Sequence, residues 1–140
     1  MSQRHLTLCL GAVVALAFGV SCVAPSRAVT TTSGLIYQIV TPGRGPAARR
    51  GQHVRIHETT TLADGTVIYS TRTNDKPLTF LLGGNQVIAG VDEGVTGMKV
   101  GERRRLVVPT SLSRRSSYPA NTPPDAILQY DIELLEVIEP

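Results

Sequence analysis

The chain has 140 residues, of which 41% are hydrophobic and 18% are charged, a composition typical of one globular domain with no room for a second. Its formal charge of +3 falls to +1 once the leader predicted below, which carries Arg4 and Arg27, is removed. So small a charge gives no reason to expect a nucleic acid partner.

Residues 1–28 are predicted to be a secretory signal peptide. Arg4 precedes an almost wholly apolar run at residues 8–20, and small residues before Ala28 favour cleavage after it. The run is shorter than the ~20 residues that span a bilayer, so no stable membrane span is expected in the mature form. A lipoprotein-type site at Cys22 is the less favoured alternative, because the large aliphatic residue usual three positions earlier is missing. We therefore expect a secreted or periplasmic domain at residues 29–139, without cysteine.

Two strands are predicted before the first hairpin. Residues 35–40 alternate as a strand after a short polar lead-in at residues 29–33. A second strand begins at His53, and its alternation turns His53 and His57 away from the apolar side. The two histidines could be a metal pair, but no third ligand follows at a familiar spacing. They are therefore interpreted as solvent-facing, and no metal site is expected.

The next segment predicts a hairpin. Ala63-Asp64-Gly65 is typical of a tight turn, and residues 66–70 after it are rich in β-branched and aromatic side chains. Another strand is predicted at residues 78–82. These strands would add to the same antiparallel sheet.

The stretch from Val87 to Met98, VIAGVDEGVTGM, predicts one short amphipathic helix around which the other elements are organised. Asp92 and Glu93 are expected to point to water. The glycines at positions 90, 94 and 97 each cost about 1 kcal/mol against alanine, so close packing of the backbone on a neighbouring surface is expected to compensate. The apolar face of the helix would consist of Ile88, Val91, Val95 and Met98.

After the helix, a strand is predicted at residues 103–108, where alternation places Arg104 on the face opposite its two arginine neighbours. A long loop at residues 109–125 follows, and loops of this length usually have a function. The last strand is predicted at residues 127–138. The fold class is therefore α+β, an antiparallel sheet of five to six strands wrapped around one short helix.

Motifs of hydrolases and transferases are absent from the sequence. It has no G-x-S-x-G elbow, no phosphate loop, no H-E-x-x-H, and no cysteine and histidine pair in the mature chain. An enzyme built from this sequence would have to work without a nucleophile, metal or cofactor.

From about Gly51 to Val137 the chain resembles the FKBP-type peptidyl-prolyl isomerases. The matching stretches, in the order and spacing of that family, are RGQHVRIHE, LADGTVIYST, KPLTFLLGGNQVIAGVDEGVTGMKVGERRRLVVP and TPPDAILQYDIELL. The resemblance implies a twisted, half-open antiparallel sheet wrapped on one helix. It also implies a shallow apolar pocket between helix and sheet that accepts a proline ring.

The resemblance further implies which residues form that pocket. Val87 and Ile88 would be its lower wall, with the Ile88 backbone N–H receiving a substrate carbonyl, and Phe80 and Tyr130 would be aromatic walls. Ordinary core packing is the alternative for each residue, above all for Phe80. The remaining substrate-binding residues implied are Ile68, Tyr69, Leu78, Val91, Glu58 and Tyr118.

Several family positions are substituted in this chain. Glu58 stands where a tyrosine is usual, Ile68 and Tyr69 replace Phe-Asp, and Val91 replaces the tryptophan of the pocket floor. Residues 113–115, Ser-Arg-Arg, replace Ala-Tyr-Gly. Each lost aromatic normally buries some 150 to 250 Å², so a wider, wetter and weaker prolyl site is predicted. Glu58 and Tyr69 could form a hydrogen-bonded pair with exchanged places, or both could face solvent.

Two functions follow from these observations. One is a secreted prolyl isomerase that assists folding with weakened activity on proline-containing segments. The other is a non-catalytic FKBP-like module for binding or assembly, motivated by the substituted pocket. A monomer is expected, since no added dimerisation segment precedes Gly34.

Overall fold

The computed structural model describes residues 26–115, 117–118 and 120–139. The leader predicted at residues 1–28 lies outside this part except for its last three residues, and so does the alternative site at Cys22. Within the described ranges, no helix is long and apolar enough to cross a membrane.

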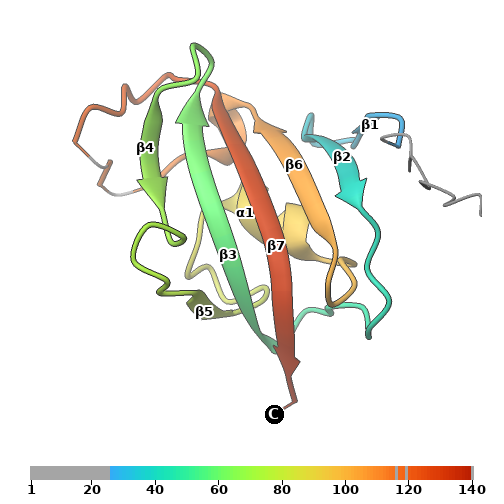
Figure 1. Cartoon of the computed structure of the whole chain (residues 1–140). Helices are drawn as coiled ribbons and strands as arrows, with labels where there is room; N and C mark the ends of the chain where they lie inside the picture. Colours follow the sequence, from blue (N-terminus) through green and yellow to red (C-terminus); the bar gives the residue numbers. More distant parts are fainter. Residues whose placement is uncertain (1–25, 116, 119, 140) are drawn as a thin grey trace, which may run out of the picture.

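The architecture is one antiparallel sheet curved over one short helix, as predicted (Figure 1). The sheet has seven strands in the order β1-β2-β6-β7-β3-β4, with β5 paired to β3 beside this path. In chain order the elements are β1 (Val29–Thr30), β2 (Ile36–Thr41), β3 (His53–Leu62), β4 (Val67–Ser70), β5 (Leu78–Leu81), α1 (Ala89–Val95), β6 (Arg103–Val108), a 3-10 helix (Thr110–Leu112) and β7 (Leu128–Ile138).

The six strands predicted from the sequence correspond to β2 to β7, and β1 is the seventh. Its two residues pair with β2, Val29 opposite Tyr37 and Thr30 opposite Ile36, where the sequence predicted only a polar lead-in. So short a strand carries no periodicity that a sequence could reveal.

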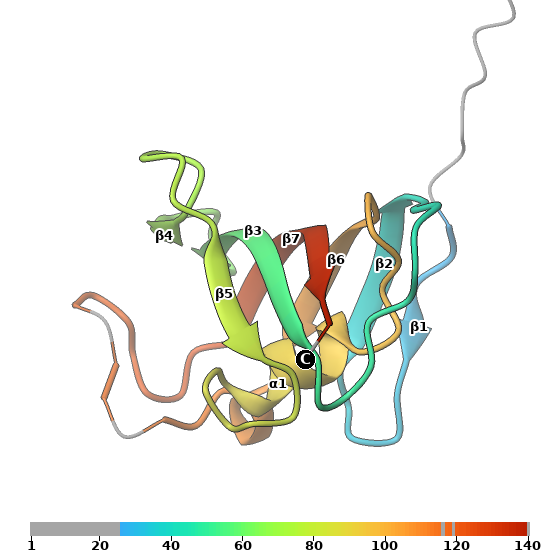
Figure 2. The same cartoon turned by 90° about the horizontal axis from the view of Figure 1, so that it is seen from below.

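The core lies between the inner face of the sheet and α1, which sits beneath the strands in Figure 2. The apolar face predicted for the helix is confirmed, since all four of its residues are buried. The close packing expected at the three glycines is found at two of them, whereas nothing lies within 4 Å of a Cβ placed on Gly97. A Cβ on Gly90 or Gly94 would collide with the side chains of Val108 and Leu106 on β6. Gly97 lies just after the helix with φ +83°, a conformation that favours glycine.

Two side chains on α1 differ from the prediction that both point to water. Asp92 is only 8% exposed, because its Oδ1 accepts a hydrogen bond from the Gly83 N–H at 2.7 Å. Glu93 is half-buried and accepts a hydrogen bond from the Ser33 hydroxyl. These contacts tie the helix to the segment between β5 and α1 and to the turn between β1 and β2.

The histidine interpretation needs a similar correction. His53 is exposed as predicted, whereas the side chain of His57 is only 14% exposed. Its Nδ1 lies 2.9 Å from the Thr71 hydroxyl and its Nε2 lies 3.3 Å from Asp75. The turn after β4 therefore covers His57.

The strands at the centre of the sheet follow the predicted alternation. Arg104 on β6 is buried, as the prediction that it lies on the face opposite its two arginine neighbours requires. Its Nη1 donates to the Gly94 carbonyl at 2.9 Å, and its guanidinium group forms an ion pair with Glu102. On β3 the alternation continues past Ile56 to Glu58 and Thr60, both buried on the inner side. The inner face near α1 thus includes polar side chains.

Candidate functional site

A hollow of about 470 Å³, here called the inner hollow, opens between the start of α1, strands β3, β4 and β7, and the loop before β7. Of the ten residues predicted for the prolyl site, eight line it and two do not. The eight are Val87, Ile88, Tyr130, Ile68, Tyr69, Leu78, Val91 and Glu58. Residues that are distant in the sequence therefore meet at one place.

The floor of the inner hollow is formed where the chain enters α1. Ile88 is 7% exposed, and its carbonyl accepts the first hydrogen bonds of the helix, from the N–H groups of Val91 and Asp92. Within the described part of the chain, its own N–H makes no backbone hydrogen bond. Two hydrogen bonds hold the segment between β5 and α1 in place. Asp92 accepts one from the Gly83 N–H, and the Gln86 side chain accepts the other from the Leu81 N–H at 2.8 Å. The floor is therefore apolar, with one backbone donor free.

Tyr130 on β7 forms an aromatic wall. Its ring is almost completely buried, and its hydroxyl receives a hydrogen bond from Nη2 of Arg115 at 3.2 Å. Burial and the nearby Glu58 carboxyl raise the pKa of the Tyr130 phenol above its usual value. The phenol is therefore neutral at physiological pH.

Glu58 lies deep in the inner hollow, with 7% of its surface exposed. Burial raises the pKa of its carboxyl to about 7, although the positive charge of Arg115 acts in the opposite direction. Tyr69, in contrast, is 47% exposed at the rim. No hydrogen bond joins Glu58 to Tyr69, both of which are described, so the predicted exchanged pair is not formed. The alternative that both side chains face solvent does not hold either, because Glu58 is buried.

Phe80 and Tyr118 are the two predicted residues that do not line the inner hollow. Phe80 pairs with Val54 in the register of β5 and β3, and its ring is 2% exposed within the core cluster. Phe80 therefore packs in the core, which was the alternative to a place in the wall of the pocket. Tyr118 is half-buried in the loop before β7.

The inner hollow also has lining residues that the sequence did not assign to it. Thr60 could have been inferred from the alternation of β3, two positions after Glu58. Arg115 and Thr122 come from the long loop, whose path no periodicity specifies. Arg115 Nε and Thr122 Oγ1 are buried and have no hydrogen-bond partner among the described residues. The other lining residues missed were Asn85, Gln86, Arg114 and Leu128.

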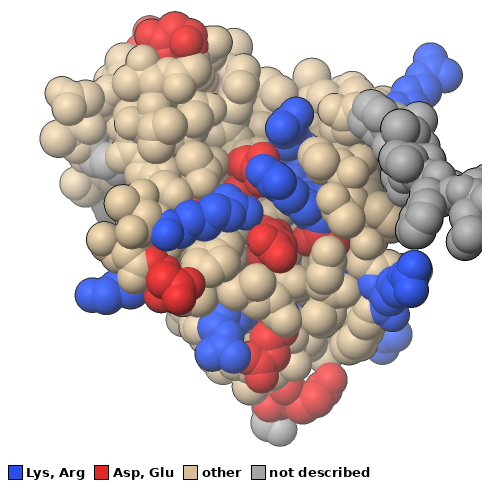
Figure 3. All heavy atoms as spheres, viewed as in Figure 1, with Lys and Arg blue, Asp and Glu red and all other residues tan. Residues whose placement is uncertain are grey.

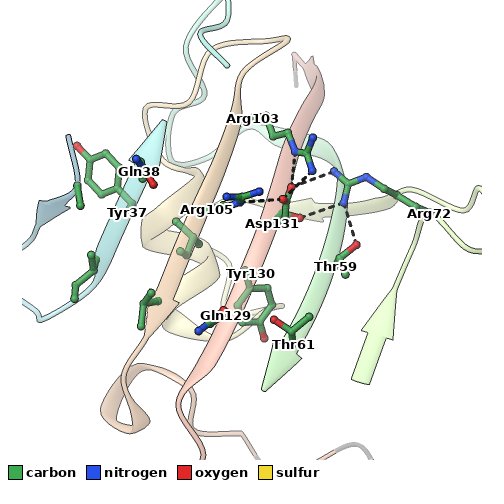
Figure 4. A pocket seen from close by; sticks show the side chains of 14 residues that line it. Tyr37, Gln38, Thr59, Thr61, Arg72, Arg103, Arg105, Gln129, Tyr130 and Asp131 are labelled. Atoms are coloured by element: carbon green, nitrogen blue, oxygen red, sulfur yellow. Dashed lines mark hydrogen bonds and ion pairs between the residues drawn. The ribbon is translucent and has the colours of Figure 1, made fainter. Parts of the chain in front are cut away.

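A second hollow, of about 480 Å³, lies on the opposite, outer face of the sheet (Figure 4). Its polar side is an ion network in which Arg103 binds Asp131 through Nε at 2.7 Å and Nη2 at 2.9 Å, and Arg72 and Arg105 approach the same carboxylate. Burial raises the pKa of Asp131, but the hydrogen bonds and charge of Arg103 outweigh it and keep this pKa below its usual value.

Acidic and basic side chains alternate across this outer face (Figure 3). The three arginines of this second hollow, the outer hollow, all approach the Asp131 carboxylate, and Arg72 also approaches Glu133. Among the described residues no group of three or more potential metal ligands occurs. The inner hollow, with its apolar floor and free backbone donor, is the stronger candidate site.

Comparison with known proteins gives one consistent result. Residues 45–135 match the family described as FKBP-type peptidyl-prolyl cis-trans isomerase. The chain is 40% identical over 100 residues to the peptidyl-prolyl cis-trans isomerase Fkbp12 of Drosophila melanogaster. The aligned residues cover 70% of this chain and 93% of that protein. It is also 38% identical over 107 residues to the FK506-binding protein of Neisseria meningitidis serogroup B. The aligned residues cover 76% of this chain and 98% of that protein.

Solved structures agree in fold. FkpA from Escherichia coli matches with a TM-score of 0.71 and 35% identity, over 79% of this chain and 51% of that one. AtFKBP13 matches with a TM-score of 0.71 and 31% identity, over 79% of this chain and 98% of that one.

Proposed function

Because this chain belongs to the FKBP-type peptidyl-prolyl cis-trans isomerase family and is an isomerase of that type, we propose that it assists the folding of secreted or periplasmic proteins. The leader expected at residues 1–28 supports the export part of the proposal. Its substrates are proline-containing segments of chains that have not finished folding.

The observation that carries the assignment of the site is the convergence of Val87, Ile88 and Tyr130 on the inner hollow. In our proposal the proline ring rests on Val87, Ile88 and Val91, beside the ring of Tyr130. The free Ile88 N–H then donates to a carbonyl of the peptide and orients it.

The chemistry of such a site requires no bond to be broken. Prolyl isomerisation turns the chain about a partial double bond with a barrier of ~18 to 20 kcal/mol. The twisted amide has lost its resonance and carries less charge separation than the planar one. An apolar seat that excludes water therefore favours the twisted form over the ground state, and this difference lowers the barrier.

Weakened activity is part of the proposal. Glu58, Arg114 and Arg115 place polar groups on the walls of the inner hollow, and Val91 fills less space than the aromatic residue usual in the family. A wall that attracts water stabilises the planar, more polar amide, so a smaller share of the binding energy is specific to the twisted state.

A refolding assay tests the proposal. A reporter protein whose slow phase is a prolyl isomerisation is refolded with increasing amounts of this protein and, in parallel, of the Drosophila melanogaster relative. We expect the rate of the slow phase to rise in proportion to the concentration of this protein, with a smaller slope than for the relative. An unchanged rate at micromolar protein would contradict the proposal and favour the non-catalytic binding module.

A further inference from the structure

We propose that the inner hollow selects substrates with a negatively charged side chain on the residue immediately before the proline, and that Arg115, assisted by Arg114, makes this selection. The inference rests on the proposed function, because it assigns a sequence preference to the same site. The ligand class is a prolyl peptide with a carboxylate or phosphate group at that position.

Arg115 is positioned to meet a ligand. It comes from the loop before β7, and its Nη2 donates to the Tyr130 hydroxyl at 3.2 Å, so the guanidinium group lies against the aromatic wall of the hollow. Its Nε is buried and has no hydrogen-bond partner within the described ranges of the chain. Buried donors in folded proteins are almost always paired, so this guanidinium group has hydrogen-bonding capacity that no described residue satisfies.

Thr122 provides a second, independent observation. It is only 9% exposed, it lines the same hollow, and its Oγ1 is also without a partner among the described residues. Two residues of one loop that line the hollow therefore each carry an unsatisfied buried polar atom.

The charges of the hollow set the sign of the preference. The charged side chains that line it are Arg114, Arg115 and Glu58. Among the described residues no ion pair joins Glu58 to Arg115, although the charge of Arg115 acts on the Glu58 carboxyl from a distance. Because burial raises the pKa of Glu58 to about 7, the lining carries a net charge between +1 and +2 near neutral pH. Such a wall attracts an anion and repels a lysine.

The geometry of the reaction identifies the position that is read. The bond that turns joins the proline nitrogen to the carbonyl of the preceding residue, so both residues must enter the hollow together. Their Cα atoms are 3.80 Å apart when this bond is trans and ~2.9 Å apart when it is cis. With the ring on Val87 and Ile88, the preceding residue is therefore held close enough for its side chain to reach a wall of the hollow. Arg114 and Arg115 are the basic residues of those walls.

The test measures kcat/KM for the full chain on peptides that differ only before the proline. The series contains glutamate, phosphoserine, glutamine, leucine and lysine, assayed at about pH 6 and low ionic strength, where Glu58 is mainly protonated. We expect glutamate to exceed its neutral isostere glutamine by about tenfold, as for one charge-assisted hydrogen bond, with lysine lowest. The glutamate and phosphoserine arms distinguish the two anions.

Variants assign the preference to residues. Arg115→Gln should reduce the ratio of glutamate to glutamine to about one, and Arg115→Glu should make lysine the better substrate. Arg105→Gln, a loss of the same charge on the outer face, should leave the ratio unchanged. If an Arg115 variant does not fold, Arg114→Gln and a salt titration of the unmodified protein replace it, since added salt should lower the ratio.

The outcomes separate the two proposals. If the protein isomerises all peptides with equal kcat/KM, the selection is refuted and the proposed function stands. If it isomerises none of them, the proposed function fails, and binding of the same peptides by calorimetry decides the selection. Equal affinity for glutamate and lysine peptides would then refute it. Unchanged selectivity in a folded Arg115→Gln variant would show that another residue is responsible.

Discussion

Glu58 lies opposite Ile132 in the register of β3 and β7, so a carboxyl group occupies the inner layer of the sheet beside a fully buried isoleucine. Burial raises the pKa of this carboxyl from 4.5 to about 7 against the opposing charge of Arg115. Tyr130 on β7 and Tyr69 at the rim are the other titratable groups around it. Burial of the Glu58 carboxyl therefore lowers the free energy of unfolding by an amount that depends on pH.

That cost predicts the effect of Glu58→Gln. Below pH 4.5 the carboxyl is protonated in both the folded and the unfolded state, so it causes no penalty. Between pH 4.5 and about pH 7 the unfolded chain loses its proton first, and the free energy of unfolding falls as pH rises. The full penalty, about 3 kcal/mol by the linkage of pKa to stability, is present above this range.

Glu58→Gln should therefore raise the free energy of unfolding by about 3 kcal/mol at about pH 8 and by little at about pH 4.5. Urea denaturation at several pH values across this range measures the difference. The difference between variant and unmodified protein is the readout, because Asp131 and other carboxyls also titrate near the acid end. A difference that does not change with pH would contradict the buried, titrating carboxyl.

Gly94 predicts an effect opposite to helix propensity. Alanine is about 1 kcal/mol better than glycine inside a helix, yet a Cβ here would meet the Leu106 side chain at a distance that real atoms do not adopt. Overpacking of this kind typically costs about 1 to 3 kcal/mol. Gly94→Ala should therefore lower the melting temperature. Ala89→Gly, at an exposed position on the same helix, is the control for propensity alone. A stabilised Gly94→Ala variant would refute the close packing.

Asp92 should influence the site without touching the substrate. Its bond to the Gly83 N–H fixes the segment between β5 and α1, which carries Val87 and Ile88. Asp92→Ala should cost about 1 to 3 kcal/mol, because the part-buried Gly83 N–H loses its acceptor, and should raise KM more than it lowers kcat. Asp92→Asn keeps an oxygen acceptor and should retain most of both. Equal losses in the two variants would indicate that the negative charge, and not the hydrogen bond, is what matters.

The main elements of the fold are predictable because their periodicity is strong. Alternation places Ile56, Arg104 and Leu128 on their correct faces, and helical spacing identifies the buried side of α1. The cost of glycine in a helix predicts a close approach to a neighbouring surface, and that surface is β6. These features depend on local sequence, and tertiary contacts reinforce them.

The features that the sequence does not predict depend on contacts between distant segments. Asp92 has the sequence environment of an exposed helix residue, and only the path of the β5–α1 segment gives it a buried partner. The approach of Arg115 to Tyr130 likewise depends on how a long loop folds back over the sheet, which no pattern in residues 109–125 specifies. The resemblance implies that Phe80 is a wall of the site, but the register of β5 with β3 turns it into the core.

Exchange NMR on a glutamate-proline peptide with catalytic amounts of protein tests most directly whether proline isomerises in the inner hollow. Val87→Asp places a charge without a partner on the apolar floor, while Val67→Asp places the same charge at a position that is 59% exposed. We expect exchange cross-peaks between the cis and trans forms with the unmodified protein and with Val67→Asp, and at least a hundredfold slower exchange with folded Val87→Asp. Unchanged exchange with a folded Val87→Asp variant would contradict the account and place the catalytic site elsewhere.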